Sequence, residues 1–208
     1  MTQPGIDVSS AAASCAVPIN AALEAFVGCR RDDQIVVTHQ GSARLWPLLS
    51  HHPLDFNYNP STMGGAVPFA VGIALIRPRH EVVVFTGDGS LLMNLGSLVT
   101  VVASGARNIS VVVLDNGIYE VTGGQRTPAQ GTSIDYAQLA RGAGFVSVDQ
   151  CDSSSELPSR IKSLYAAEGP RFIAVRVGPA SAADLQRAGT PLEQQIRRVR
   201  QSLAVHDS

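Results

Sequence analysis

Short apolar runs rich in β-branched residues, each followed by a longer segment with helical spacing, constrain the fold of this chain more than any other feature. The clearest runs are QIVVT at 34–38, EVVVF at 81–85, ISVVVL at 109–114 and RFIAVRV at 171–177. Runs that are apolar at nearly every position, rather than at alternate positions, are typical of strands buried on both faces of a parallel sheet. They therefore predict an α/β fold, a doubly wound and mainly parallel sheet with helices on both faces.

The segments between these runs predict the remaining elements. A fifth strand is predicted at 145–148, and a loop at 51–60, where His, Asn and Pro are frequent. Helices are predicted at 17–27, 42–49, 63–76, 91–104, 136–142, 156–167 and 191–204. A chain of 208 residues fits one domain. We divide it into a flexible leader at 1–16, an α/β domain at 17–180 and a C-terminal helical tail at 181–208.

Composition excludes several classes of function. The formal net charge of −1 gives no electrostatic reason to expect a nucleic-acid or membrane-surface partner. The most apolar stretch, 65–76, is too short to span a bilayer, and no secretory signal is visible, so we expect a cytoplasmic protein. Cys15, Cys29 and Cys151 show no CxxC spacing, which argues against a disulfide framework, a zinc ribbon or a cysteine-ligated iron–sulfur cluster within the chain.

Polar residues follow three of the predicted strands, at the edge where parallel sheets bind ligands. They are Gly41–Ser42 in the first loop, Gly87–Asp88–Gly89–Ser90 in the second and Asp115–Asn116–Gly117 in the third. Free backbone N–H groups, a hydroxyl, a carboxylate and an amide suit a phosphate group together with Mg²⁺. Each signal alone is weak, because Asp88 could simply cap a helix and Asn116 could simply form a turn. The spacing strengthens the pair, since one helix and one strand fit between them.

At these residues the chain resembles the thiamine diphosphate enzymes. GDGSLLMNLGSLVTVVASGARNISVVVLDN is similar to their cofactor motif, GDG followed one helix and one strand later by Asn-Asn, with Asp115 in place of the first Asn. STMGGAVPFAVGIALIRP and the TGGQ at 122–125 also resemble family segments, most closely those of the phosphonopyruvate and sulfopyruvate decarboxylases. The resemblance identifies 17–180 as a domain of the kind that binds thiamine diphosphate and Mg²⁺.

The resemblance implies a role for each matching residue. Asp88 and Asn116 are expected to bind Mg²⁺ through their side chains, and Ile118 through its carbonyl oxygen. Met63 takes the place of the apolar residue that wedges between the two cofactor rings; the alternative is ordinary packing at a helix start. The full set expected to bind the cofactor is Gly41, Ser42, Ser61, Met63, Gly87, Asp88, Gly89, Ser90, Asn116, Ile118 and Tyr119.

For four residues a simpler structural role is the alternative. Ser42 and Ser61 could act as helix caps. His39 and Thr122 are expected to contact the substrate, and the alternative for both is a turn residue bonded to nearby backbone. No catalytic acid or base is assigned within the chain.

The resemblance also implies a partner. Family enzymes pair this module with a second α/β module, which binds the aminopyrimidine ring and carries the Glu that activates the cofactor. The leader and the tail are too short to form that module, so the Glu is expected on a partner chain in a heterodimer or an α2β2 assembly, with self-association of this chain as well. The implied function is the cofactor-binding subunit of a 2-oxo acid decarboxylase, a lyase, or of a carboligase that forms carbon–carbon bonds, active only with its partner.

Two alternatives stay open at this point. DNGIYEVTGGQRTP is similar to a run in 2-oxo acid ferredoxin oxidoreductases, although the chain lacks the cluster cysteines that such subunits generally carry. The other alternative is a non-catalytic nucleotide-binding module of the same fold.

Overall fold

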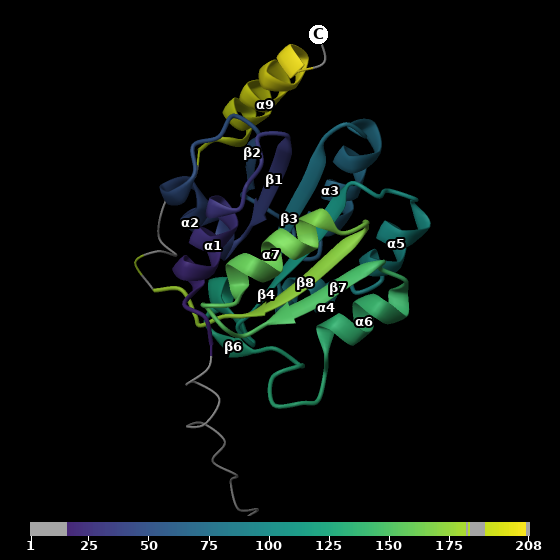
Figure 1. Cartoon of the computed structure of the whole chain (residues 1–208). Helices are drawn as coiled ribbons and strands as arrows, with labels where there is room; N and C mark the ends of the chain where they lie inside the picture. The colour runs from purple at the N-terminus through teal and green to yellow at the C-terminus, as the bar shows by residue number, and fades with distance from the viewer. Residues whose placement is uncertain (1–15, 182, 184–189, 207–208) are drawn as a thin grey trace, which may run out of the picture.

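The fold is a six-stranded parallel sheet with the strand order β2-β1-β3-β4-β8-β7 (Figure 1). The structure is a computed structural model that describes residues 16–181, 183 and 190–206. The strands of this sheet are β1 (Gln34–His39), β2 (Asp55–Tyr58), β3 (Glu81–Gly87), β4 (Ile109–Asp115), β7 (Ser147–Cys151) and β8 (Arg171–Arg176).

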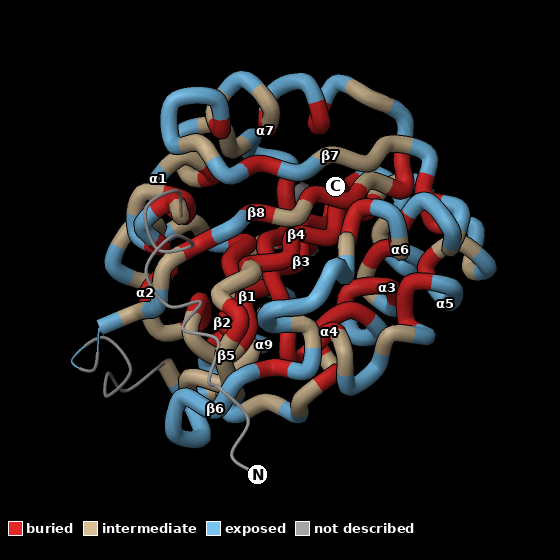
Figure 2. Tube along the Cα trace, turned by 90° about the horizontal axis from the view of Figure 1, so that it is seen from below, coloured by how far each residue is buried: buried red, intermediate tan, exposed pale blue. Residues whose placement is uncertain are grey.

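Helices cover both faces of the sheet. The described helices are α1 (Ile19–Gly28), α2 (Gly41–Leu49), α3 (Ala66–Ile76), α4 (Asp88–Met93), α5 (Ser97–Ala103), α6 (Tyr136–Ala143), α7 (Leu157–Ala166) and α9 (Leu192–His206). Successive residues of β3 point to opposite faces: Val82 and Val84 pack against α3 and α5, whereas Val83 and Phe85 pack against α1, α2 and α7. Figure 2 shows the central strands buried between these layers. The predicted doubly wound α/β fold is confirmed.

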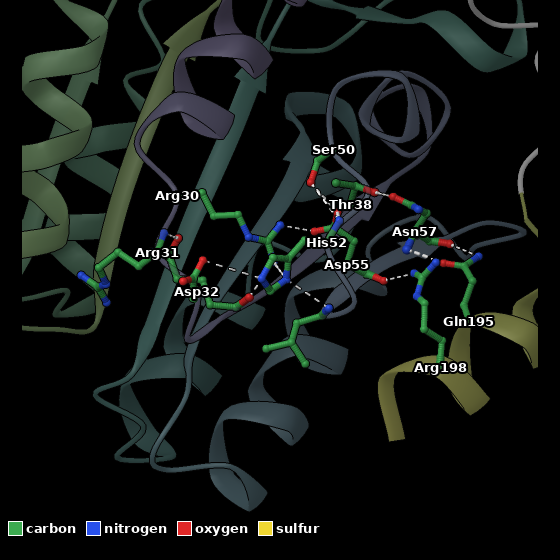
Figure 3. A network of polar contacts seen from close by, with 12 residues as sticks. Arg30, Arg31, Asp32, Thr38, Ser50, His52, Asp55, Asn57, Gln195 and Arg198 are labelled. Carbon is green, nitrogen blue, oxygen red and sulfur yellow. Dashed lines mark hydrogen bonds and ion pairs between the residues drawn. The ribbon is translucent and has the colours of Figure 1, made fainter. Parts of the chain in front are cut away.

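The prediction of a loop at 51–60 is wrong, because Asp55–Tyr58 forms the edge strand β2. Its sequence, DFNY, lacks the continuous apolar pattern that revealed the other strands. The strand is completed by α9: the side-chain amide of Gln195 accepts from the backbone N–H of Asn57 at 2.7 Å and donates to its carbonyl at 3.0 Å (Figure 3). A residue of the tail, 138 positions away, thus supplies the hydrogen bonds of a missing neighbouring strand.

Other boundaries differ from the predicted ones. The apolar segment 91–104 is two helices, α4 and α5, separated near Asn94, whose side chain donates to the carbonyl of Gly64 at 3.0 Å. The helix predicted from 63 begins at Ala66, because Gly64 has φ 74° and belongs to a turn. The last predicted strand but one lies at Ser147–Cys151, two to three residues later than expected.

A small hairpin of β5 (Ile118–Tyr119) and β6 (Gln125–Arg126), joined by the 3-10 turn η2 (Glu120–Thr122), was not predicted. Of the predicted leader, residues 1–15 lie outside the described residues, and Val17 pairs with Val177 rather than starting a helix. The division of the chain at 16 and 180 stays a prediction. Within the described residues, no helix has both the length and the apolar character needed to cross a membrane.

Candidate active site

The loops after β1, β3 and β4 meet in one pocket at the carboxyl edge of the sheet. These strands are adjacent and parallel, and Gly87 pairs in register with Leu114, so the residues that follow them lie side by side. The lining includes ten of the eleven residues predicted to bind the cofactor, together with His39. Its remaining members are Ile19, Gln40, Leu114, Glu120 and Val121.

Asp88 opens α4 and is 1% exposed. Its Oδ2 accepts from the hydroxyl of Thr127 at 2.9 Å, and backbone N–H groups of Gly89 and Asn116 also donate to the carboxylate. Burial, assisted by the negative charge of Asp115, raises the pKa of Asp88 to about 6, and the hydrogen bonds to the carboxylate offset part of this rise. A buried carboxylate with a second anion nearby is an electrostatic setting that a bound cation would relieve.

Asn116 follows β4 and lines the same pocket as Asp88. Its Oδ1 accepts from the backbone N–H of Ile118 at 3.0 Å and keeps a second lone pair. Its amide group also donates to Glu120, whose carboxylate accepts from the backbone N–H of Ala180 at 2.5 Å. Burial raises the pKa of Glu120 despite these two hydrogen bonds. The contacts fix which end of the Asn116 amide is the oxygen.

The donor set of the pocket fits Mg²⁺ and a diphosphate. A carboxylate, an amide oxygen and a backbone carbonyl are ligands that Mg²⁺ prefers, with phosphate and water completing its shell. None of the described residues that line the pocket is Lys or Arg. A diphosphate bound here would therefore depend on a divalent cation and on backbone N–H groups for neutralisation. Within the described residues, no group of three His, Cys, Asp or Glu forms a competing metal site.

The glycine and serine residues of the second loop are tightly placed. A Cβ atom at Gly89 would collide with the ring of Tyr119 and lie 3.0 Å from Thr127, so the hairpin packs on α4 only because residue 89 is glycine. The Oγ of Ser90 accepts from the backbone N–H of Gly64 at 2.9 Å, which leaves its proton to donate. Ser90 thereby ties the loop before α3 to the GDG turn.

In the first loop, the side chain of Ser42 is engaged locally. Its Oγ accepts from the backbone N–H of His39 at 3.1 Å and donates to the carbonyl of the same residue at 2.8 Å. These contacts agree with a local capping role for Ser42, which was the alternative to cofactor binding. The backbone N–H groups of Gly41 and Ser42, at the start of α2, are the donors of this loop that have no partner within the helix.

His39 is 2% exposed and lines the pocket. Its Nε2 lies 3.2 Å from the carbonyl of Thr62, and its Nδ1 has no hydrogen-bond partner in the described part of the chain. Burial lowers the pKa of His39, and the contact with Thr62 offsets this effect in part. The imidazole is therefore neutral at pH 7, and the Thr62 carbonyl places its proton on Nε2.

Two predicted residues lie outside the pocket lining. Ser61 is half-buried in the segment before α3. Thr122 is exposed, and its hydroxyl contacts the carbonyl of Tyr119 at 3.3 Å and Oε1 of Gln125 at 3.1 Å. This matches the turn reading of Thr122, and Gly123 and Gly124, both with positive φ, complete that turn. Substrate contacts by Thr122 and His39 stay predictions.

In the absence of metal, the free energy of unfolding should depend on pH through the titration of the buried Asp88 carboxyl. Its folded pKa of about 6 lies above the ordinary value of 3.8, so the folded chain binds this proton more tightly than the unfolded chain does. Stability should fall by about 2–3 kcal/mol as the pH rises from about 4 to about 7, and stay level above that. Asp88→Asn removes this titration. In urea unfolding with EDTA, the variant should gain stability relative to the parent across this pH window; parallel curves would contradict the assignment.

Comparisons with known proteins agree with this geometry. The family model described as "Thiamine pyrophosphate enzyme, C-terminal TPP binding domain" matches residues 36–175. A phosphonopyruvate decarboxylase of Streptomyces viridochromogenes is 36% identical over 170 residues, which cover 82% of this chain and 42% of the relative. A sulfopyruvate decarboxylase subunit beta of Methanothermobacter thermautotrophicus is 35% identical over 161 residues, which cover 77% of this chain and 82% of the relative.

A solved structure also matches. A protein from Mycobacterium smegmatis, assigned as a thiamin diphosphate-dependent enzyme, superposes with a TM-score of 0.66 and 27% identity over 80% of this chain and 32% of its own. The chain thus spans less than half of the Streptomyces relative and of this structure, and most of the archaeal beta subunit. By the family match, which extends over more than half of its residues, the chain belongs to the thiamine pyrophosphate enzymes, in the family of their C-terminal TPP-binding domain.

Proposed function

We propose that the chain is the cofactor-binding subunit of a heteromeric thiamine diphosphate-dependent 2-oxo acid decarboxylase or carboligase. The observation that carries this proposal is the meeting of Asp88, Asn116 and Ile118 in one pocket whose described lining holds no basic side chain other than the neutral His39. The relatives support decarboxylation, since both are named decarboxylases. These relatives favour a decarboxylase over a ferredoxin oxidoreductase. An absence of iron in the purified complex would agree with a decarboxylase.

In this proposal the residues of the chain hold the cofactor and exclude water. Asp88 and Asn116 bind Mg²⁺ by side-chain oxygens, and Ile118 binds it by its carbonyl. Ser90 and the N–H groups at the starts of α2 and α4 donate to the diphosphate. The bound cofactor supplies an electron sink for the electron pair left when carbon dioxide departs from a 2-oxo acid.

The activating carboxylate is proposed to belong to a partner subunit. The two carboxylates of the described lining are already engaged, Asp88 by Thr127 and Glu120 by Ala180. Asp55, another buried acid, is the first residue of β2 and therefore lies at the amino ends of the strands, away from the pocket. Arg30 and Ser50 bind it there (Figure 3). The name "subunit beta" of the archaeal relative supports a two-subunit arrangement.

The outer surface of α3 supports the same proposal. This helix, AVPFAVGIALI, has no polar side chain on any face, although a helix at a water-exposed surface normally has one polar side. Phe69, Leu75 and Ile76 are 38%, 52% and 70% exposed. The helix begins three residues after Met63 of the pocket, so a partner that covered this apolar surface would also close the pocket.

Met63→Ala should lower the catalytic rate of the reconstituted enzyme far more than it weakens cofactor binding. The diphosphate and metal contacts stay, while the bent cofactor loses the side chain that supports it. A slightly misplaced reacting group costs on the order of 10²-fold in rate. Steady-state kinetics and calorimetric titration of the cofactor measure the two effects separately.

Met93→Ala is the matched control, because Met93 is 57% exposed on α4 and outside the pocket. It should change neither rate nor affinity. If Met63→Ala keeps the parent rate as well, Met63 serves packing alone.

A further inference from the structure

Gln40 adopts a backbone conformation that only glycine takes without strain. With φ 53° and ψ −118°, it is the one non-glycine residue with positive φ among the described residues. These angles match the first central position of a type II′ turn, where a Cβ atom is crowded and glycine dominates. The residue lies in the pocket lining, immediately before α2.

The residues on both sides of Gln40 are held by hydrogen bonds and burial. On the N-terminal side, the hydroxyl of Thr38 donates to Asn57 at 2.7 Å, and Asn57 is held by Gln195 of α9 (Figure 3). His39 is buried, with its ring on the carbonyl of Thr62. A turn that is fixed from both directions can hold a strained residue at its centre.

On the C-terminal side, Ser42 binds both the N–H and the carbonyl of His39, and the N–H of Ala43 donates to the carbonyl of Gln40 at 3.1 Å. A glycine at position 40 would close the same turn at no steric cost. The presence of glutamine therefore breaks a local rule at a pocket, which is where a side chain with a specific use is to be expected.

The side chain of Gln40 reaches across the pocket wall to Met63. Its Nε2 lies in contact with the Sδ of Met63, on the loop before α3. Methionine has three rotatable bonds and a polarizable sulfur, so its position is poorly fixed without a neighbour. The backbone beside Met63 is held at Gly64, whose N–H donates to Ser90 and whose carbonyl accepts from Asn94, so it is the side chain of Met63 that needs a neighbour to fix it.

We propose that Gln40 is a positioning residue that fixes the Met63 side chain against the cofactor rings, with the backbone strain at position 40 as the cost. The inference rests on the proposed function for its catalytic consequence, but not for the contact itself. Gln40 determines where the Met63 thioether lies before the cofactor binds. The loop after β1 and the loop before α3 then form one preorganised wall.

Two substitutions separate the strain from the contact. Gln40→Gly removes both, so the melting temperature should rise by about 2–4 °C while Met63 loses its restraint. Gln40→Leu keeps a Cβ atom and hence the strain, but lacks the donor. It should free Met63 without raising the melting temperature.

Methionine methyl NMR gives a readout that needs neither cofactor nor partner. The chain has three methionines, Met1, Met63 and Met93, so ¹³C-methyl labelling gives three signals, with Met63→Leu to assign the relevant one. In both variants the Met63 signal should shift and narrow, and the exposed Met93 should stay unchanged as an internal control. A Met63 signal that is unmoved in both variants overturns the proposal, as does a Gln40→Gly variant that melts no higher than the parent.

In the reconstituted enzyme, both variants should lower kcat by about tenfold at unchanged KM for the cofactor, because only the ring position is affected. A rise in that KM without a fall in kcat contradicts positioning. Failure of the proposed function can be distinguished from failure of the Gln40 proposal. In the first case the parent complex would release no carbon dioxide, while the NMR and melting results would still hold.

Discussion

Asp88→Ala should abolish the Mg²⁺-dependent binding of thiamine diphosphate. The substitution removes the one charged side-chain ligand proposed for the metal, at a pocket whose described lining contains no Lys or Arg to bind the diphosphate directly. Loss of a buried charged partner costs about 3–5 kcal/mol, so the cofactor affinity should fall by at least about 10²-fold. Calorimetric titration of the cofactor, with Mg²⁺ and then with EDTA, measures this loss.

Asp149→Ala is the matched control for that experiment. Asp149 lies in strand β7, pairs with Arg160 at 3.0 Å and lies outside the pocket. It should leave the affinity unchanged. The Asp88 variant itself should fold, because it removes a carboxyl group whose ionisation burial disfavours, and circular dichroism checks this. An Asp88→Ala variant with the parent affinity would show that the metal site has been misassigned.

The central strands were predictable from the sequence because burial on both faces leaves a signal at every residue. Val82 to Phe85 contribute to the two cores alternately, so no polar residue is tolerated among them. The edge strand β2 left no such signal. Its Asp55 and Asn57 are buried through contacts with Arg30, Thr38 and Gln195, which are distant in the sequence. Long-range side-chain pairing of this kind cannot be derived from local pattern.

The pocket, too, contains residues that could be predicted from the sequence and residues that could not. Its GDG turn and Asn116 could be recognised from their order after successive strands. Thr127, which binds Asp88, comes from a loop 39 residues later, and although it lies within the run DNGIYEVTGGQRTP, nothing in that pattern marks it as a partner of Asp88. The backbone angles of Gln40 could not be predicted, because they depend on the tertiary contacts that hold Thr38 and His39. The break between α4 and α5 was missed because Leu91, Leu95 and Leu98 keep a helical spacing across it.

The chain alone should be inactive as a decarboxylase and should become active when its partner subunit is added. The pocket holds the proposed metal and diphosphate groups, yet both carboxylates of its described lining are engaged by other groups. A partner that covers the apolar surface of α3 would close the pocket over the aminopyrimidine ring and supply the activating Glu. The cofactor should therefore bind weakly to the isolated chain and at least about tenfold more tightly to the complex, as expected when a second surface completes a site.

Without its partner, the exposed apolar surface of α3 should make the chain self-associate. Leu75→Glu and Ile76→Glu place charges on this surface, and they should reduce both self-association and partner binding without changing the pocket. Sedimentation velocity of the chain, alone and mixed with the partner, distinguishes these variants from the parent. Parent-like association of both variants would exclude this surface as the interface.

The central claim is that this chain forms only one part of an active site that a partner subunit completes. The most direct test measures carbon dioxide release from a series of 2-oxo acids by the purified chain with thiamine diphosphate and Mg²⁺. The measurement is made before and after addition of a purified candidate aminopyrimidine-binding subunit. The account predicts no release above background from the chain alone, and turnover that appears with the partner and is lost again with Asp88→Ala. Robust turnover by the chain alone would contradict it, because an activating acid would then have to lie within these 208 residues.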